Sequence, residues 1–345
     1  MENIDKVTRT TARPAMRLAA LSLLVAASLV AVSLVATVFL AGMTSAAQAA
    51  TAAGASVRGT TARIQALLDR PVNGKVDLPS GTFTIRPALR LHQTETIIGH
   101  HTTLKVASGS DNYAAVLSGA SAATDLTGLT ITGVTFDQNT AGNPIHSVSP
   151  LYHGFPRFVV LVVAGSNVKI THNTFKNTNN LNTIVTGGAA SHATISGNVF
   201  RTINAPWHDH SSVYTTGPQT VISGNTFVGS SAIAAAIEVH GTGVTVTRNR
   251  VAGYYRGVNI VSPHTTVSHN KVIGAVNPVD LWSTVSPGLH DVKVTHNLLN
   301  RNLPSWSRAM RTHGGIPSAG YTKQVITDST SKFPMHRIII RGNHG

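Results

Sequence analysis

The chain has 345 residues, of which 42% are hydrophobic, 12% are charged and none is cysteine, and its formal net charge at pH 7 is +14. The hydrophobic content excludes a disordered chain, and the lack of cysteine excludes a disulfide-stabilised one. Thirty glycines and recurring short runs of Val, Ile and Thr favour many short strands over long amphipathic helices.

The basic charge favours a polyanionic partner, although it also fits a surface that only keeps the protein soluble. No nucleic-acid-binding motif accompanies the charge. We therefore expect an acidic polysaccharide or cell-wall glycan as partner, and no nucleic acid.

Residues 1–49 are predicted to be a secretory leader or a retained N-terminal membrane anchor. Basic residues precede an uncharged apolar run over 18–42, and the small-residue site Ala47-Gln48-Ala49 follows it. The run is longer than the ~7–15 apolar residues of a usual leader and long enough for the roughly 20 residues that span a bilayer. Either outcome places the rest of the chain outside the cytoplasm, with 50–58 as a linker and the membrane touched only through this segment.

Residues 59–125 are expected to form an N-terminal cap and the first repeating units. The stretch 61–70 places Ile64, Leu67 and Leu68 on one helical face. The stretch 74–85 has the pattern of strand, turn and strand. A short helix followed by strands is therefore predicted here.

An internal repeat extends over 126–300. Its copies contain "ITHNTF", "ISGNVF", "ISGNTF", "VTRNRV", "VSHNKV" and "VTHNLL", whose asparagines lie 25, 27, 24, 21 and 27 residues apart. "ITGVTF" is a related copy with Val134 in the asparagine position, and the chain ends on "IRGNHG". Each copy predicts a strand, a tight bend and another strand, in which Asn tolerates a left-handed backbone and bonds its neighbours. Stacked copies would form an asparagine ladder and a continuous core.

A period of this size with three short strands per turn resembles the right-handed parallel β-helix of the pectin-lyase-like superfamily, over roughly 59–345. The resemblance implies an all-β solenoid of coils of about 21–27 residues, closed at one end by the short N-terminal helix. The framework of a leucine-rich solenoid is absent. Residues 301–335 are expected to leave the solenoid as a lateral loop, and 336–345 to form a last partial coil.

Counting back from the repeat asparagines aligns a second strand in neighbouring coils. Because side chains alternate along a strand, Val213, Ile237, Val258 and Val279 are predicted to point inward. The outward positions then form two columns, which include Val162, Tyr214, Glu238, Asn259 and Asp280 in the first, and His240 and Trp282 in the second. These residue types on one face predict a polysaccharide-binding groove.

The segment "PWHDH" over 206–210 leads into the strand of Tyr214. Trp207, His208, Asp209 and His210 are predicted to form a wall of the groove and to contact substrate. In the alternative, Asp209 bonds nearby backbone and the two histidines are solvated. Because His-x-His without a third ligand is a weak signal, no metal-ligating residue is predicted.

The superfamily resemblance implies a polysaccharide-active protein and leaves three functions open. In a lyase, His240 or Tyr214 would act as base in a β-elimination, and Arg256 or a bound Ca²⁺ near Glu238 and Asp280 would neutralise the uronate. In an inverting hydrolase, Glu238 and Asp280 would be the acid and base. In a non-catalytic scaffold, the same groove would only bind glycan. The expected catalytic residues are Glu238, His240, Asp280 and Tyr214, and the expected substrate contacts are Trp207, His208, Asp209, His210, Asn259, Arg256 and Trp282.

Overall fold

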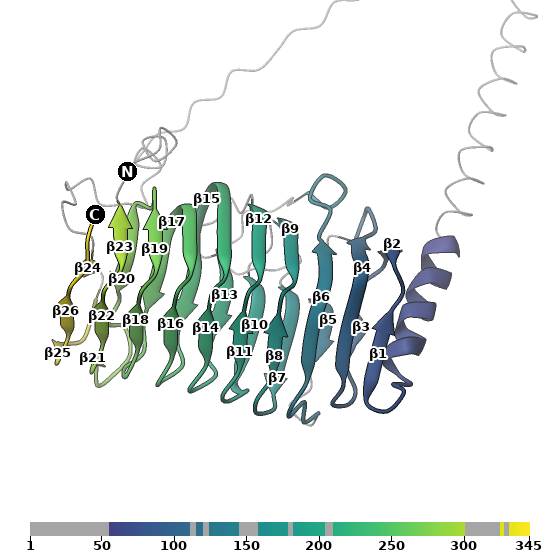
Figure 1. Ribbon diagram of the computed structural model, residues 1–345, viewed down its shortest axis with the longest axis horizontal. Coiled ribbons are helices and arrows are strands. Elements are labelled where there is room, and N and C mark those ends of the chain that lie inside the picture. Colours follow the sequence, from purple (N-terminus) through teal and green to yellow (C-terminus); the bar gives the residue numbers. More distant parts are fainter. Residues whose placement is uncertain are drawn as a thin grey trace, which may run out of the picture. The chain divides into compact units, whose positions relative to one another are not determined.

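A computed structural model describes residues 55–110, 115–119, 124–144, 158–178, 182–203, 210–300, 325–327 and 331–345. One helix over 55–68 precedes strands β1 to β26, and every registered strand pair is parallel. The coils stack side by side along one axis, with the helix at the first coil (Figure 1). The described part is the predicted all-β right-handed parallel β-helix with a short N-terminal helix. In this part of the chain, no helix is long and apolar enough to cross a bilayer.

Three parallel sheets run along the solenoid. The first sheet contains one strand from most coils. Two long strands, β15 and β17, contribute only their C-terminal halves to it. Its strands are β3 (Leu89–Arg90), β5 (Ala115–Gly119), β7 (Phe158–Ala164), β10 (Asn182–Ala189), β13 (His210–Thr215), β15 (Thr226–Val239), β17 (Arg250–Ile260), β20 (Asn277–Leu281) and β24 (Val325–Thr327).

The second and third sheets share β4 and β6, and the third also takes the N-terminal halves of β15 and β17. The second sheet contains β1 (Lys75–Leu78), β4 (Thr96–Val106), β6 (Thr130–Asp137), β8 (Lys169–Thr171), β11 (Thr194–Ser196), β14 (Val221–Ser223), β16 (Thr245–Thr247), β18 (Thr266–Ser268), β22 (Lys293–Thr295) and β26 (Ile339–Arg341). The third adds β2 (Gly81–Ile85), β9 (Thr174–Thr178), β12 (Val199–Ile203), β19 (Lys271–Ile273) and β23 (Leu298–Asn300), and β21 (Leu289–His290) pairs separately with β25 (Met335–His336).

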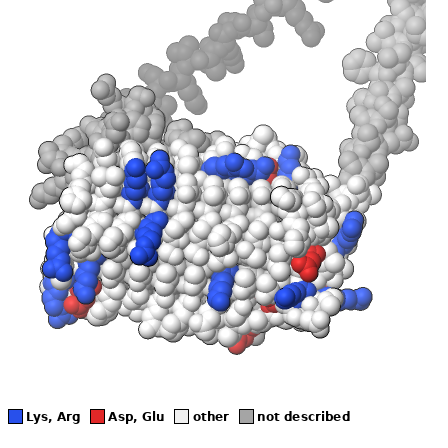
Figure 2. Space-filling model, in the orientation of Figure 1, with Lys and Arg blue, Asp and Glu red and all other residues white. Residues whose placement is uncertain are grey.

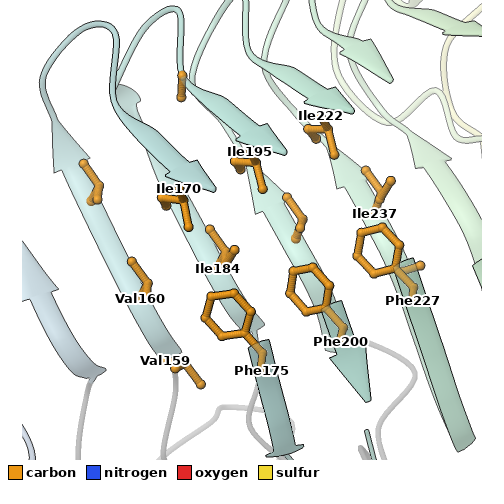
Figure 3. Packing of buried hydrophobic residues seen from close by; sticks show 14 of the residues in the cluster. Val159, Val160, Ile170, Phe175, Ile184, Ile195, Phe200, Ile222, Phe227 and Ile237 are labelled. Carbon is orange, nitrogen blue, oxygen red and sulfur yellow. The ribbon is translucent and has the colours of Figure 1, made fainter. Parts of the chain in front are cut away.

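The core consists of stacks of aligned apolar side chains, and each coil contributes a side chain to several stacks, as with Ile170, Phe175 and Ile184 (Figure 3). Four phenylalanines stack in succession, with centroid separations of 5.2, 5.0 and 4.5 Å: Phe136, Phe175, Phe200 and Phe227. Val213, Ile237, Val258 and Val279 are fully buried, as predicted from strand alternation. Burial of such side chains stabilises the fold by roughly 1.5–3 kcal/mol each, and only stacked coils provide it.

The predicted asparagine ladder is confirmed. In each step, the backbone N–H and side-chain Nδ2 of one asparagine both donate to Oδ1 of the next, as Asn198 does to Asn225 at 2.9 and 3.0 Å. Nδ2 also donates to a carbonyl of the preceding coil, here that of Ile170 at 2.7 Å. The ladder extends to Asn343, and it begins where the Val134 N–H donates to Asn173. Val134 thus occupies the first position of the ladder, where only the backbone N–H donates because valine has no side-chain amide.

The left-handed residue of each bend is the one before the asparagine, which differs from the prediction. His172, Arg248, His269 and His296 have φ between 55° and 58°, and glycine occupies this place in other coils. The asparagine itself is thereby free to stay buried and bond along the ladder. His269 and His296, which both precede a ladder asparagine, stack with ring centroids 5.4 Å apart.

The outer surface of the second sheet is a regular array of hydroxyl groups, which we call the hydroxyl face. Its members occupy equivalent positions of successive coils and are all partly exposed: Thr132, Thr171, Ser196, Ser223, Thr247, Ser268 and Thr295. Basic side chains dominate acidic ones on the face of the molecule drawn in Figure 2. Both features agree with a chain of low charge content and basic balance.

Within 301–335, two described pieces join the solenoid. β24 pairs with β20, and β25 pairs with β21, both in parallel. Residues 301–324 lie outside the described residues, as do the leader and most of the linker at 1–54. The last strand, β26, pairs with β22 and carries the ladder to its final asparagine.

Candidate functional site

The outer surface of the first sheet, here the site face, brings four predicted residues into register. Tyr214 of β13 pairs with Glu238 of β15, which pairs with Asn259 of β17, which pairs with Asp280 of β20. His240 and Trp282 follow two residues after Glu238 and Asp280. Most of the predicted residues therefore lie on adjacent strands, about 4.8 Å apart per coil.

Val162 does not belong to this column, so that part of the prediction is wrong. Val162 is fully buried, and Leu161 pairs through Val185 with Tyr214. Twelve residue positions separate Leu161 from Asn173, whereas eleven separate Tyr214 from Asn225. The turn after β7 is one residue longer, and a one-residue slip exchanges the two faces of a strand.

Glu238 is the centre of a buried hydrogen-bond network. Its side chain is only 7% exposed. Oε1 lies 2.8 Å from Nε2 of His240 and accepts from Nδ2 of Asn259 at 3.4 Å. Oε2 accepts a short hydrogen bond from the Ser211 hydroxyl. Both carboxylate oxygens are thus held in place.

This network keeps Glu238 ionised. Burial alone raises the pKa of a carboxyl group. Here the hydrogen bond and charge of His240, the hydrogen bond of Ser211 and the charge of Arg256 outweigh burial and hold the pKa of Glu238 below its ordinary value. Glu238 is therefore an anion at neutral pH and cannot serve as a proton donor there.

Asp280 forms a second buried carboxylate centre, which is fully buried. Its Oδ2 accepts from Nε of Arg256 at 2.8 Å and from Nδ2 of Asn277 at 3.3 Å. The Arg256 guanidinium carbon lies 5.8 Å from the Trp282 ring centroid and 5.7 Å from that of Tyr255, within range of a cation–π interaction. The aromatic rings and the ion pair thus fix one guanidinium beside the site face.

His240 and Tyr214 are two partly exposed members of the site. Their rings lie 4.8 Å apart at an interplanar angle of 34°. The His240 side chain is 24% exposed, whereas its partner Glu238 is buried beneath it. A histidine held by a buried carboxylate and still open to solvent is the arrangement of a general base.

Of the five residues in "PWHDH", four of which were predicted to contact substrate, only His210 is described. It begins β13 and is fully buried, paired with Ala234 of β15. It therefore lacks the exposed position expected for a groove wall or a solvated loop. Trp207, His208 and Asp209 lie outside the described residues.

Ser211 and Asn277 belong to the site but were missed from sequence. Ser212 hydrogen-bonds the fully buried Tyr254 hydroxyl at 2.8 Å, and Val213 also lies in the core. Two consecutive inward residues break the alternation, so Ser211 shares the outward side with Glu238. Strict alternation counted back from the inward Val213 would place Ser211 in the core, so sequence reasoning did not select it. Two adjacent serines before Val213 are the one sequence feature at this break.

Two amide oxygens of the site are buried without a hydrogen-bond partner among the described residues. They are Oδ1 of Asn259 and Oδ1 of Asn277. Such acceptors usually bond water or ligand. Hydroxyl groups of a sugar are suitable donors for them.

The residues present do not suit Ca²⁺. This ion takes 6–8 oxygen ligands. The Glu238 oxygens already accept from Ser211, His240 and Asn259, and Asp280 accepts from Arg256. The fixed guanidinium of Arg256 beside these carboxylates opposes the binding of a second cation.

No protein-family model and no curated protein matches the chain. Solved structures of the tailspike protein of E. coli bacteriophage HK620 are similar to it. A double mutant in complex with a pentasaccharide matches with a TM-score of 0.63 at 18% identity, over 83% of this chain and 53% of the tailspike chain. A glutamate-to-glutamine mutant in complex with a pentasaccharide matches with a TM-score of 0.64 at 18% identity and the same coverages. The chain spans about half the length of these tailspikes, and the likeness establishes the fold alone, which is a right-handed parallel β-helix.

Proposed function

We propose that this β-helix protein binds an acidic polysaccharide along the site face and cleaves it by β-elimination, with His240 as the base. The observation that carries the proposal is the 2.8 Å contact between His240 and the buried, ionised Glu238. In this reaction the base takes the proton on the carbon beside the sugar carboxylate, a carbon–carbon double bond forms, and the glycosidic carbon–oxygen bond breaks. Glu238 fixes the imidazole ring and stabilises the imidazolium that forms.

The other site residues have roles that follow from their positions. Arg256 presents a positive charge beside the site and attracts the uronate carboxylate. Neutralising this carboxylate makes the proton on the neighbouring carbon more acidic and stabilises the enolate that forms when the base removes it. Trp282 and Tyr214 offer partly exposed rings to sugar rings. Tyr214, packed on His240, is the alternative base or the proton donor to the leaving oxygen. The buried side chains of Asn259 and Asn277 donate to Glu238 and Asp280 and hold these two carboxylates in place.

An acidic substrate outside the cytoplasm fits the chain as a whole. The formal net charge of +14 favours polyanions, and the basic and apolar pattern of 1–49 favours export. The similar tailspike structures hold a pentasaccharide, which supports a glycan as the partner of this fold. Export of the protein to the cell surface or beyond, free or anchored, is part of this proposal and is supported by the pattern of 1–49.

Hydrolysis is the second candidate. Glu238 and Asp280 lie two coils apart, so their backbones are about 9–10 Å apart, a separation that suits an inverting carboxylate pair. The tailspike mutants in the similar structures change an aspartate and a glutamate. Against hydrolysis, the ionised Glu238 and the arginine-paired Asp280 leave neither carboxyl as a ready acid.

The test is to incubate the full chain with pectate, alginate, glycosaminoglycans and neutral glycans, with and without Ca²⁺. Ultraviolet absorbance of unsaturated uronates and new reducing ends are recorded together. Both signals rising on an acidic glycan support elimination, and reducing ends without absorbance support hydrolysis. Retained glycan binding with neither signal supports a non-catalytic scaffold and overturns the proposed reaction.

Two variants assign the residues. His240→Ala is expected to lower turnover by roughly 10²–10⁴-fold, the usual contribution of a general base, and Glu238→Gln by about 100-fold because the imidazole loses its anionic partner. Ser223→Ala on the hydroxyl face is the matched control and should keep full turnover. Unchanged turnover in His240→Ala, with the glycan still bound, would remove His240 from the mechanism.

A further inference from the structure

A cluster of metal-ligating side chains lies outside the site face, on turns near the end of the solenoid. His264, His290 and Asp291 each offer one ligand atom, and these atoms all lie within 4.8 Å of one another. In the described part of the chain, this is the one group of its kind with three such residues. We call it the turn cluster.

The fold fixes the backbone beneath the turn cluster. His264 lies in the turn between β17 and β18, and His290 and Asp291 lie where β21 passes into β22. The His264 N–H donates to the His290 carbonyl at 3.0 Å. His264 and Asp291 both have a left-handed backbone, with φ of 57° and 55°. Adjacent coils therefore present these three side chains on the same edge.

The distances suit a transition metal ion. Oδ2 of Asp291 lies 2.9 Å from Nδ1 of His290 and 3.6 Å from Nδ1 of His264. Zinc binds nitrogen and carboxylate oxygen at about 2.0–2.2 Å, so tetrahedral ligand atoms lie about 3.4 Å apart. Two imidazoles and a carboxylate suit zinc better than Ca²⁺ or Mg²⁺. The two histidine rings are nearly perpendicular, at 88° and 4.9 Å.

Arg337 of the next coil competes for the carboxylate. Its Nε and one terminal nitrogen donate to the two oxygens of Asp291, both at 2.6 Å. The Arg337 side chain is 67% exposed, so it can turn into solvent without losing buried contacts. A metal ion and the guanidinium would therefore exclude each other at Asp291.

We propose that His264, His290 and Asp291 form a binding site for a divalent transition metal ion of the zinc type, and that Arg337 lowers its affinity by pairing with Asp291. Water would complete the coordination. The ion would link two adjacent coils, and it would stabilise the folded state in proportion to its binding. This site is separate from the glycan reaction and does not depend on it.

The test is titration of the full chain with Zn²⁺ by calorimetry at pH 7.5, with Co²⁺ absorption to report coordination by nitrogen and oxygen. The wild type should bind one equivalent of Zn²⁺. His264→Ala and Asp291→Asn should each weaken binding at least tenfold, whereas Arg337→Gln should strengthen it at least threefold. His296→Ala, in the stacked histidine pair without a carboxylate, is the matched control and should bind as the wild type does.

The sign of the Arg337 effect separates this site from other histidines of the chain. Absence of Zn²⁺ binding in the wild type overturns the proposal. So does binding that persists unchanged in the His264→Ala variant, or that weakens in Arg337→Gln. Circular dichroism of each variant ensures that a lost site is not a lost fold.

Discussion

The hydroxyl face and the site face differ although the same coils build them. Both are outer surfaces of parallel sheets with one strand per coil. The hydroxyl face repeats a small, neutral, partly exposed side chain, as in Ser223 and Thr247. The site face instead buries Glu238, Asn259 and Asp280 in adjacent coils.

The difference shows where this solenoid bears an energetic cost. Buried charge is unfavourable unless hydrogen bonds and opposite charges compensate for it. On the site face, Ser211, His240, Asn259 and Arg256 supply that compensation. The hydroxyl face needs none, because its groups stay in contact with water. The ionisable side chains of the candidate site thus lie on the face where equivalent positions of successive coils carry different residue types.

The largest effect is expected from a substitution in the asparagine ladder, which tests whether the ladder stabilises the coils that carry both faces. Asn225→Ala leaves two Asn198 donors and the Ile195 carbonyl without partners. Since each buried unsatisfied group costs about 1–3 kcal/mol, the free energy of unfolding should fall by roughly 3–5 kcal/mol. Urea denaturation measures it, with Ser223→Ala as the neighbouring control. A loss below about 1 kcal/mol would mean that the coils hold without the ladder.

The next test compares Glu238 with a buried carboxyl that has no compensation. Glu95 is 2% exposed, and neither of its carboxylate oxygens has a hydrogen-bond partner among the residues that the structure describes. Burial, with the nearby charge of Asp69, raises its pKa from 4.5 to about 7. The folded state therefore binds the proton more tightly, so stability is full below pH 4.5 and falls as pH rises to about 7.

Glu95→Gln should abolish this loss, which by linkage amounts to about 3 kcal/mol. Unfolding free energies at pH 4.5 and pH 8 measure it, with Asp125→Asn, on a fully exposed carboxyl, as the control. An equal pH dependence in wild type and Glu95→Gln would show that the carboxyl finds water or another partner when it ionises.

A smaller effect is expected within the site. Ser211→Ala removes the donor to Oε2 of Glu238 and lets the carboxylate and His240 shift. Turnover should fall about tenfold, which corresponds to ~1.4 kcal/mol, and the pH of half-maximal activity should move upward as the pKa of Glu238 rises. Ser211→Thr keeps the hydroxyl and should recover most of the turnover. Activity that follows protein stability alone would reduce Ser211 to a packing role.

The smallest effect is expected on the hydroxyl face. Thr247→Val replaces a partly exposed hydroxyl whose contact to Ser268 is long, at 3.4 Å. The unfolding free energy should change by less than about 0.5 kcal/mol and turnover should not change. A loss of turnover here would show that the two faces are functionally connected.

The sequence predicted the features that repeat. The period, the ladder, the buried Val213 and Ile237 and the register of Glu238 with Asp280 all follow from residue spacing. The errors lie where spacing changes: the longer turn after β7 misplaced Val162, and the break at Ser212 hid Ser211. The turn cluster was missed because His264 and Asp291 meet through left-handed turns, which strand alternation does not describe.

The asparagine ladder also has a direction. Every ladder asparagine from Asn173 to Asn297 donates twice to Oδ1 of the asparagine in the following coil. These asparagine-to-asparagine hydrogen bonds all point the same way and polarise one another, whereas the bond from Nδ2 to a backbone carbonyl points to the preceding coil. The N-terminal coils are synthesised first. Each new coil therefore brings an asparagine Oδ1 to the backbone N–H and Nδ2 of the asparagine in the coil before it. The last coil formed at any stage thus exposes two unpaired N–H donors, and the asparagine of the next coil supplies the oxygen that accepts from both.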